Sequence, residues 1–373
     1  MSTERQPLEI MFLQQEEAIE AGLTDMEGCV EKMEYVFELY NQGRVIMGGG
    51  TTSGQTIHGH MTTFPDEPEY PEVPESGPDR RFGAMPAYVG GDVHKMGVKW
   101  YGSNVNNPTE RGIPRSLHTI TLNDPDSGEP LFLMDGQVES AMRTGAVSGV
   151  GAKYIQGDRA EVATIIGPGV IGQTSALAMD VALDSLKEIQ IHHPELRKAE
   201  AFKEYMEDDI DTEIVPNDSP EDAISKGDVV SVAAAGSPPP RIKESWLKDD
   251  TVVIPLGDLR VPLEAFEEEL VFCDIPKNDL EFAEHLDWDI TNALGAAVDY
   301  NKGLKIDEED LRAIHDIITG KDSEPTDGKS IFYPLGLPME DVTWTNEVYQ
   351  NAKKMGLGQT LTLFEEPYFQ KPY

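Results

Sequence analysis

Short apolar runs alternate with amphipathic segments through the second half of the chain. The apolar runs are rich in Val and Ile, as buried strands are, and the segments between them have helical spacing. The strand-like runs lie at residues 162–166, 188–191, 213–215, 229–235, 251–256 and 270–273. Strands that alternate with helices predict right-handed crossovers and a doubly wound parallel sheet.

The first part of the chain has a different pattern, in which strand-like runs follow one another after an amphipathic helix at 25–43. These runs lie at residues 82–89, 96–101, 116–122 and 131–134. A helix over 136–154 leads into the alternating region, and we expect the tail at 320–373 to return to the first part. The predicted fold class is α/β, with a doubly wound domain at 138–319 and an α+β domain built from 1–137 and 320–373.

A glycine-rich turn follows the first strand of the alternating region, with Gly167, Gly169 and Gly172 before a helix over 173–186. Gly167 permits the tight turn, Gly169 lets the backbone approach a pyrophosphate, and Gly172 lets helix and strand pack closely. A phosphate would then sit on the helix N-terminus. The motif indicates a Rossmann-type dinucleotide site that includes Val170 and Ile171, or else a strand-to-helix turn that simply requires glycine.

The choice between NAD and NADP is open. An acidic residue about 20 positions after the glycines would bind the ribose hydroxyls of NAD, but this sequence has His193 there. Arg197 and Lys198 follow and could meet a 2′-phosphate. Thr144, on the helix that precedes the glycine-rich strand, is a further candidate for the cofactor site.

Two charged residues stand out against their surroundings. Lys99 lies inside an apolar run, and strand alternation places it on the face opposite Val98 and Trp100; the ordinary interpretation is a solvated lysine. Asp258 follows Gly257 just past the end of a predicted strand, where ligands of such sheets bind. It is a candidate functional carboxylate, or a turn or capping aspartate.

The charge balance limits the possible partners. The chain has 68 acidic and 30 basic residues, a net charge of −38, which argues against nucleic acid or an anionic membrane. Dispersed carboxylates fit a protein of concentrated salt, or simply an acidic cytosolic enzyme. We see neither an apolar run of membrane-spanning length nor a signal peptide, and the two cysteines, Cys29 and Cys273, suggest a reduced cytoplasmic protein.

Several motifs together resemble the ornithine cyclodeaminase and mu-crystallin family. The motifs are GVKWYGS at 97–103, LNDPDSGEP at 122–130, SAMRTGAVS at 140–148, IIGPGVIG at 165–172 and GLPMED at 336–341. Their order and spacing match over nearly the whole chain. The resemblance implies NAD or NADP as cofactor and a homodimer, with a substrate domain formed by the N-terminal part and the returning tail.

The resemblance also implies roles for individual residues. It places Lys99 and Arg143 around the carboxylate of an amino-acid substrate and makes Asp258 the acid/base near the amino group. Lys99 could also take part in catalysis by transferring a proton. The family commonly has one further carboxylate-binding arginine, and here His58, His60 or Arg81 could replace it. A metal site made by the two histidines is the alternative, although no clear third ligand accompanies them.

The activity that the resemblance implies is hydride transfer at the carbon that carries the amino group. Ornithine cyclodeamination to proline is the leading expectation, and an opine, imine or alanine dehydrogenase is the alternative. A mu-crystallin-like binding protein is the expectation from a different class. The proline-rich segment at 62–78 predicts an extended acidic loop, which is a linker, a lid or a dimer-contact arm.

Overall fold

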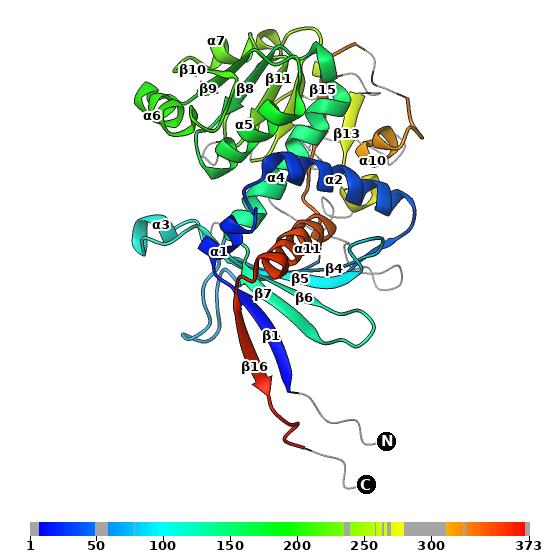
Figure 1. Ribbon diagram of the computed structural model, residues 1–373. Coiled ribbons are helices and arrows are strands. Elements are labelled where there is room, and N and C mark those ends of the chain that lie inside the picture. The colour runs from blue at the N-terminus through cyan, green and yellow to red at the C-terminus, as the bar shows by residue number, and fades with distance from the viewer. Residues whose placement is uncertain are drawn as a thin grey trace. The chain divides into compact units, whose positions relative to one another are not determined.

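The computed structural model describes residues 7–48, 59–77, 79–234, 239–257, 259–262, 265–266, 270–279, 311–323, 325 and 327–369. These residues form two compact units (Figure 1). Unit 1 comprises Met1–Thr24, Gly43–Ser140 and Leu337–Tyr373, and unit 2 comprises Asp25–Gln42 and Ala141–Gly336. The boundaries therefore fall at Ser140 and Gly336, where we had expected them at 137 and 319, and the first long helix belongs to unit 2.

Unit 1 is built on a mixed sheet. Among its described residues the strand order is β16-β1-β7-β6-β5-β4-β2, with β3 paired to β4. The strands are β1 (Leu8–Leu13), β2 (Val45–Met47), β3 (His60–Thr63), β4 (Arg81–Val89), β5 (Lys95–Ser103), β6 (Ser116–Asn123), β7 (Pro130–Asp135) and β16 (Gln359–Phe364). The pair β1 and β7 is parallel and the other pairs are antiparallel. The four strand-like runs between 82 and 134 are thus confirmed as β4 to β7.

Helix α11 (Pro338–Met355) covers one face of this sheet, against β4, β5 and β6 (Figure 1). It begins with proline at its first turn and ends at Gly356 in the left-handed conformation, with φ +71°. The indole of Trp344 is buried and donates to the carbonyl of Leu23 at 3.2 Å. The short helices α1 (Gln15–Glu20) and α3 (Asn107–Glu110) complete the unit.

Unit 2 is a doubly wound parallel sheet, as the alternating pattern predicts. The strand order is β10-β9-β8-β11-β12-β15-β13-β14, and the described pairs are parallel. The strands are β8 (Val162–Ile166), β9 (Glu188–His192), β10 (Glu213–Asn217), β11 (Val229–Val232), β12 (Val252–Pro255), β13 (Val271–Cys273), β14 (Arg312–Ala313) and β15 (Ser330–Tyr333). Nearly continuous burial along these strands explains their unbroken apolar runs.

The described residues of unit 2 also form helices, not all of which lie between two of its strands. They are α2 (Met26–Asn41), α4 (Gln137–Ile155), α5 (Val170–Ala182), α6 (Leu196–Met206), α7 (Pro220–Ile224) and α10 (Ile314–Ile318), with 3-10 turns at Gly157–Arg159 and Glu244–Trp246. Helix α4 starts in unit 1 and continues into unit 2, and α2 packs against α5 and α10. No helix in the described ranges is long and apolar enough to cross a membrane.

Two elements differ from the expected boundaries. Strand β15 lies in the segment that we expected to return to the first part, but it pairs with β12 and β13 in unit 2 because its four residues are fully buried there. Helix α5 starts at Val170, three residues earlier than expected, because the extended backbone of Gly169 already serves as its N-cap. Its first turn therefore follows the glycine-rich turn directly.

Candidate cofactor and substrate site

The glycine-rich turn lies at the point where the strand order of unit 2 reverses. Strand β8 is flanked by β9 on one side and β11 on the other, and ligands of open α/β sheets bind outside the carboxyl ends of the strands at such a switch point. Residues 167–169 leave β8 at that end and lead into α5. The motif and the sheet topology therefore indicate the same edge.

Each glycine of the turn has a separate steric reason. Gly167 has φ +107°, and a Cβ there would lie 2.9 Å from the backbone of Ala234. A Cβ on Gly172 would lie 2.0 Å from the carbonyl oxygen of Gly167. A Cβ on Gly169 would meet no described atom within 4 Å, so the backbone at the helix N-terminus faces open space. This space, with no side-chain cap on α5, fits the pyrophosphate of a dinucleotide.

The carboxyl end of β9 carries the histidine pair. His192 is buried and its Nδ1 lies 3.1 Å from the carbonyl oxygen of Asn217. Burial lowers the pKa of His192, which is therefore neutral at pH 7. His193 follows the strand and its Nδ1 accepts the amide of Glu195 at 2.9 Å.

The two cations near His193 are already engaged by Glu195. Its carboxylate lies 2.8 Å from the Lys198 ammonium and 2.5 Å from the Arg197 guanidinium. Lys198 and then Arg197 lower the pKa of Glu195 to about 2, so the carboxylate is ionised. A 2′-phosphate would have to compete with this acidic side chain, whereas a ribose hydroxyl would not.

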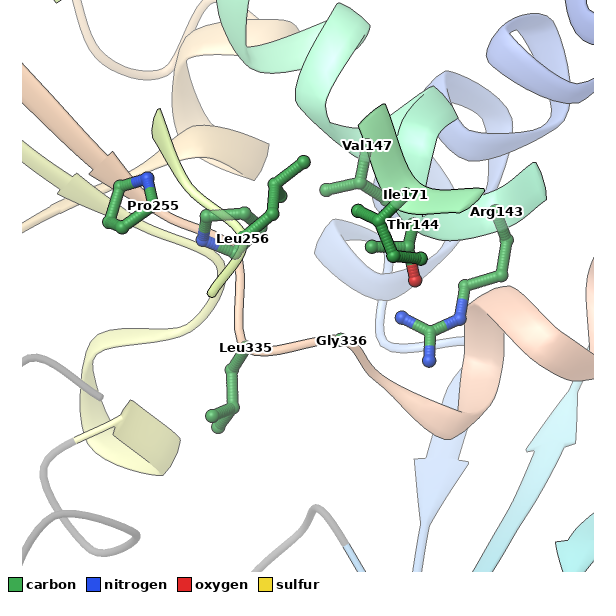
Figure 2. A pocket seen from close by; sticks show the side chains of 9 residues that line it. Arg143, Thr144, Val147, Ile171, Pro255, Leu256, Leu335 and Gly336 are labelled. Carbon is green, nitrogen blue, oxygen red and sulfur yellow. The ribbon is translucent and has the colours of Figure 1, made fainter. Parts of the chain in front are cut away.

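A cavity of about 220 Å³ opens beside the first turn of α5 within unit 2 (Figure 2). Three elements and a turn form its walls: α4, the first turn of α5, the end of β12 and the segment after β15. Its lining residues are Arg143, Thr144, Val147, Ile171, Pro255, Leu256, Pro334, Leu335 and Gly336. The structure therefore brings together Arg143, Thr144 and Ile171 from the residues that the sequence singled out.

The Arg143 side chain extends from α4 toward the turn at Leu335 and Gly336 (Figure 2). Gly336 has φ +82°, and a Cβ there would lie 2.3 Å from Arg143 Nη1. The arginine is 8% exposed, so its charge lies in a largely enclosed wall. A guanidinium in that position can hold a carboxylate through two parallel hydrogen bonds.

Asp274, which our sequence reasoning missed, binds the backbone of the same turn. It follows the last residue of β13, and its Oδ2 accepts the backbone amides of Leu335 at 2.7 Å and Gly336 at 3.2 Å. Burial and the neighbouring Asp279 raise the pKa of Asp274 to about 8. Its position after an apolar strand is the same signal that identified Asp258.

Lys99 is fully buried in unit 1, so the solvated interpretation is wrong. It is 1% exposed, and its Nζ donates to Asp341 Oδ1 at 2.6 Å and to Ser140 Oγ at 3.3 Å. Strand alternation placed it correctly, since Trp100 on the opposite face is 50% exposed. Asp341, in the first turn of α11, was not predicted.

Arg81 also lies in unit 1, at the start of β4. The Arg81 guanidinium pairs with Asp79, and the other oxygen of Asp79 lies 2.6 Å from Arg115 Nε. The Arg81 guanidinium also lies 6.0 Å from the centroid of the Tyr101 ring. Asp79 therefore forms ion pairs with two arginines in this part of the sheet. Arg81 as a substrate ligand stays a prediction.

Several expectations fall outside the described residues. Asp258 and His58 lie there, and His60 is an exposed residue of β3. Within the described ranges no group of three His, Cys, Asp or Glu side chains could hold a metal ion. Both cysteines are buried.

Comparison with known families identifies the class of protein. The model of the ornithine cyclodeaminase/mu-crystallin family matches residues 11–356, and the chain belongs to this family. The expected resemblance is thus confirmed.

Three relatives are similar over most of their lengths. Alanine dehydrogenase of Archaeoglobus fulgidus is 29% identical over 361 residues, which cover 96% of this chain and 99% of that protein. N-((2S)-2-amino-2-carboxyethyl)-L-glutamate dehydrogenase of Staphylococcus aureus is 27% identical over 323 residues, or 84% and 92% of the two chains. The solved structure of an archaeal alanine dehydrogenase dimer with bound NAD is 25% identical, has a TM-score of 0.74 and covers 96% of this chain and 100% of that chain.

Proposed function

We propose that the protein is an NAD(P)-dependent enzyme that oxidises or reduces the amino-bearing carbon of an α-amino acid. The observation that carries the proposal lies within unit 2, where the Arg143 cavity adjoins the first turn of α5 behind the glycine-rich turn. A dinucleotide on that turn and an amino acid whose carboxylate is held by Arg143 would therefore adjoin each other. The two dehydrogenases among the relatives support the same class of reaction.

The roles of the side chains follow from their chemistry. We propose that Arg143 binds the substrate carboxylate through its guanidinium fork and that Thr144 and Ile171 contact the cofactor. The nucleotide, when bound, supplies the hydride chemistry. Asp258 would take the proton of the substrate amino group and return it to the product. Lys99 stays a proposed ligand of the substrate carboxylate on the basis of the family resemblance.

NAD is the proposed preference over NADP. Glu195 holds both Arg197 and Lys198 in ion pairs near the end of β9, so a 2′-phosphate would meet a carboxylate beside these cations. The bound NAD of the archaeal alanine dehydrogenase structure agrees with this preference. Comparison of the two dissociation constants, by quenching of protein fluorescence, tests it.

A net dehydrogenase or imine reductase is the finer proposal, because both named protein relatives are dehydrogenases. Ornithine cyclodeamination, our leading expectation from the sequence, is the second candidate because the family description includes it. In cyclodeamination the second amine of the substrate attacks the imine and ammonia leaves. The resulting cyclic imine takes the hydride back from the reduced cofactor to give proline, so the cofactor ends in its starting oxidation state.

One assay separates these proposals. The purified protein is incubated with NAD or NADP and a panel of amino acids, while reduced-cofactor absorbance and ammonia are followed together. We propose high salt for the assay, since a net charge of −38 suits a screened solution. Ammonia with stoichiometric cofactor reduction supports a dehydrogenase, and ammonia from ornithine without net reduction supports a cyclodeaminase. Cofactor binding without turnover would leave only the binding-protein alternative.

We also propose a homodimer through the open face of the unit 1 sheet. Phe82, Trp100 and Leu117 are 40%, 50% and 47% exposed on the adjacent strands β4, β5 and β6, and the rings of Phe82 and Trp100 stack at 5.9 Å. Lys99, which α11 covers, points to the other face. An exposed apolar patch of this kind suits an isologous contact between two copies. Light scattering of Trp100→Asp should show monomers where the native chain gives dimers; dimers in both would contradict this interface.

A further inference from the structure

The carboxylate of Asp274 has one visible task, which is to hold the turn after β15. It is completely buried, and its Oδ2 accepts the consecutive amides of Leu335 and Gly336. Among the described residues its Oδ1 has no hydrogen-bond partner. Above the pKa of Asp274, which is about 8, the ionised oxygen accepts both backbone amides in charge-assisted hydrogen bonds, which are stronger than bonds between neutral groups. The carboxylate therefore acts as a clamp on residues 335–336.

This turn contacts the arginine that lines the cavity. A Cβ on Gly336 would lie 2.3 Å from Arg143 Nη1 and 3.3 Å from Nη2, so the turn and the guanidinium are already in close contact. Leu335 and Gly336 line the same cavity as Arg143. A shift of the turn would consequently change both the wall of the cavity and the position of the guanidinium.

We propose that Asp274 is a positioning residue, which fixes the Leu335–Gly336 turn and thereby sets where the Arg143 guanidinium meets a substrate carboxylate. The clamp itself follows from the hydrogen bonds in unit 2. Its consequence for substrate affinity rests on the proposed function. Sites of this kind need a second group that holds the binding side chain in place.

Asp279 provides a matched control because it is equally buried but does not touch the turn. Its Oδ2 accepts the amide of Ile275 at 3.3 Å, within its own segment. Two charged groups act on Asp274. Asp279 raises the pKa of Asp274, as the second cause after burial, and Arg143 from α4 lowers it. On the neighbouring strand β15, burial raises the pKa of Tyr333, so this hydroxyl stays neutral.

Hydrogen exchange tests the clamp without any assumption about activity. Above about pH 8, where Asp274 is ionised, the amides of residues 335 and 336 should exchange about tenfold faster or more in Asp274→Asn than in the native chain, because one charge-assisted acceptor is lost. At this pH Asp274 is ionised in Asp279→Asn as well, so the exchange of the two amides should stay as in the native chain. Exchange that is equal in the native chain and Asp274→Asn would overturn the clamp.

Kinetics test the consequence for the substrate. Above about pH 8, where Asp274 is ionised, we expect Asp274→Asn to raise the KM for the amino acid by about tenfold or more, with a smaller change in kcat and an unchanged dissociation constant for the cofactor. If Asp274 contributed only to stability, the variant would not raise KM selectively over kcat and the cofactor dissociation constant. A lower KM in Asp274→Asn would show that Asp274 competes with the substrate for Arg143, and would overturn the proposal.

The pH profile gives a test that survives if Asp274→Asn does not fold. Since the ionised carboxylate holds the turn more strongly, KM should fall as the pH rises through the pKa of Asp274. In Asp279→Asn this fall should move to lower pH, because the neighbouring negative charge is gone; a fall at the same pH would contradict the assignment. No turnover in the native chain would refute the proposed function, and the exchange result alone would then decide on the clamp.

Discussion

Lys99 Nζ and Asp341 Oδ1 form an ion pair at 2.6 Å between the middle of β5 and the first turn of α11, and both side chains are almost completely buried. Ser140 Oγ accepts a further hydrogen bond from the same ammonium at 3.3 Å. Two charges removed from water depend strongly on each other, because either one alone would be left without compensation. Lys99, which we propose as a substrate ligand, therefore also contributes to the stability of unit 1 through this pair.

Removal of one member of this pair should destabilise the protein strongly. We expect Asp341→Asn to lower the free energy of unfolding by about 3–5 kcal/mol, as for other buried pairs that lose a partner. Lys187 and Glu161 form the control, because they also lie 2.6 Å apart but are 66% and 58% exposed. Lys187→Ala should cost about 1 kcal/mol or less. Denaturant titration checks both, and equal costs would show that burial does not decide the strength of these pairs.

Gly169 and Gly172 should respond differently to alanine. At Gly169 the added Cβ meets no described atom and φ is −79°, so the fold should tolerate it, while the methyl group occupies the space proposed for the pyrophosphate. At Gly172 it would lie 2.0 Å from the Gly167 carbonyl oxygen. We expect Gly169→Ala to weaken cofactor binding without a change in Tm, and Gly172→Ala to lower both. Native cofactor affinity in Gly169→Ala would exclude this turn as the pyrophosphate site.

Asp258→Asn tests the proposed acid/base. The amide keeps the size of the side chain but cannot accept the proton of the substrate amino group. We therefore expect cofactor binding to stay intact and turnover to fall by a factor of about 100 or more. Stopped-flow measurement of the chemical step together with cofactor titration separates the two effects. Full activity in this variant would remove Asp258 from the mechanism.

The raised pKa of Asp274 makes a prediction for stability. Because this pKa moves from 3.8 to about 8, the folded chain keeps a proton that the unfolded chain has released at intermediate pH. The stabilising contribution of the Asp274 proton is therefore fully present below pH 3.8 and is lost as the pH rises toward about 8. Relative to Asp274→Asn, the native chain should become less stable across this window. Parallel stability curves for the two proteins would show that Asp274 does not titrate there.

Local patterns were sufficient to predict the glycine-rich turn and the parallel sheet. The steric demand on Gly172 comes from Gly167 within the same strand-turn-helix segment, and the ordered series of apolar runs predicts the strands of the sheet. The demand on Gly167 comes from Ala234 after the neighbouring strand β11, but the glycine pattern alone was enough to predict the turn. The burial of Lys99 could not be read in this way. Its partner lies 242 positions away, and only the packing of α11 on β5 shows that the lysine side of the strand is covered.

Partners that are distant in the sequence also explain why we missed Asp274 and assigned β15 to the wrong part of the chain. A carboxylate after an apolar strand was a readable signal, but its hydrogen bonds reach a turn 61 and 62 positions further on. Strand β15 inserts between β12 and β13, although β13 precedes it in the chain. Order along the sequence therefore does not reveal order across this part of the sheet, and we assigned the segment to the tail.

Transfer of deuterium from the substrate tests the central claim most directly. An amino acid that carries deuterium at its α-carbon is incubated with the protein and NAD, and the cofactor is analysed by mass spectrometry. A dehydrogenase that acts at the amino-bearing carbon should yield reduced cofactor one mass unit heavier than from unlabelled substrate. Deuterated proline from labelled ornithine with no reduced cofactor would instead support cyclodeamination. No label in cofactor or product, despite cofactor binding, would contradict the proposed activity.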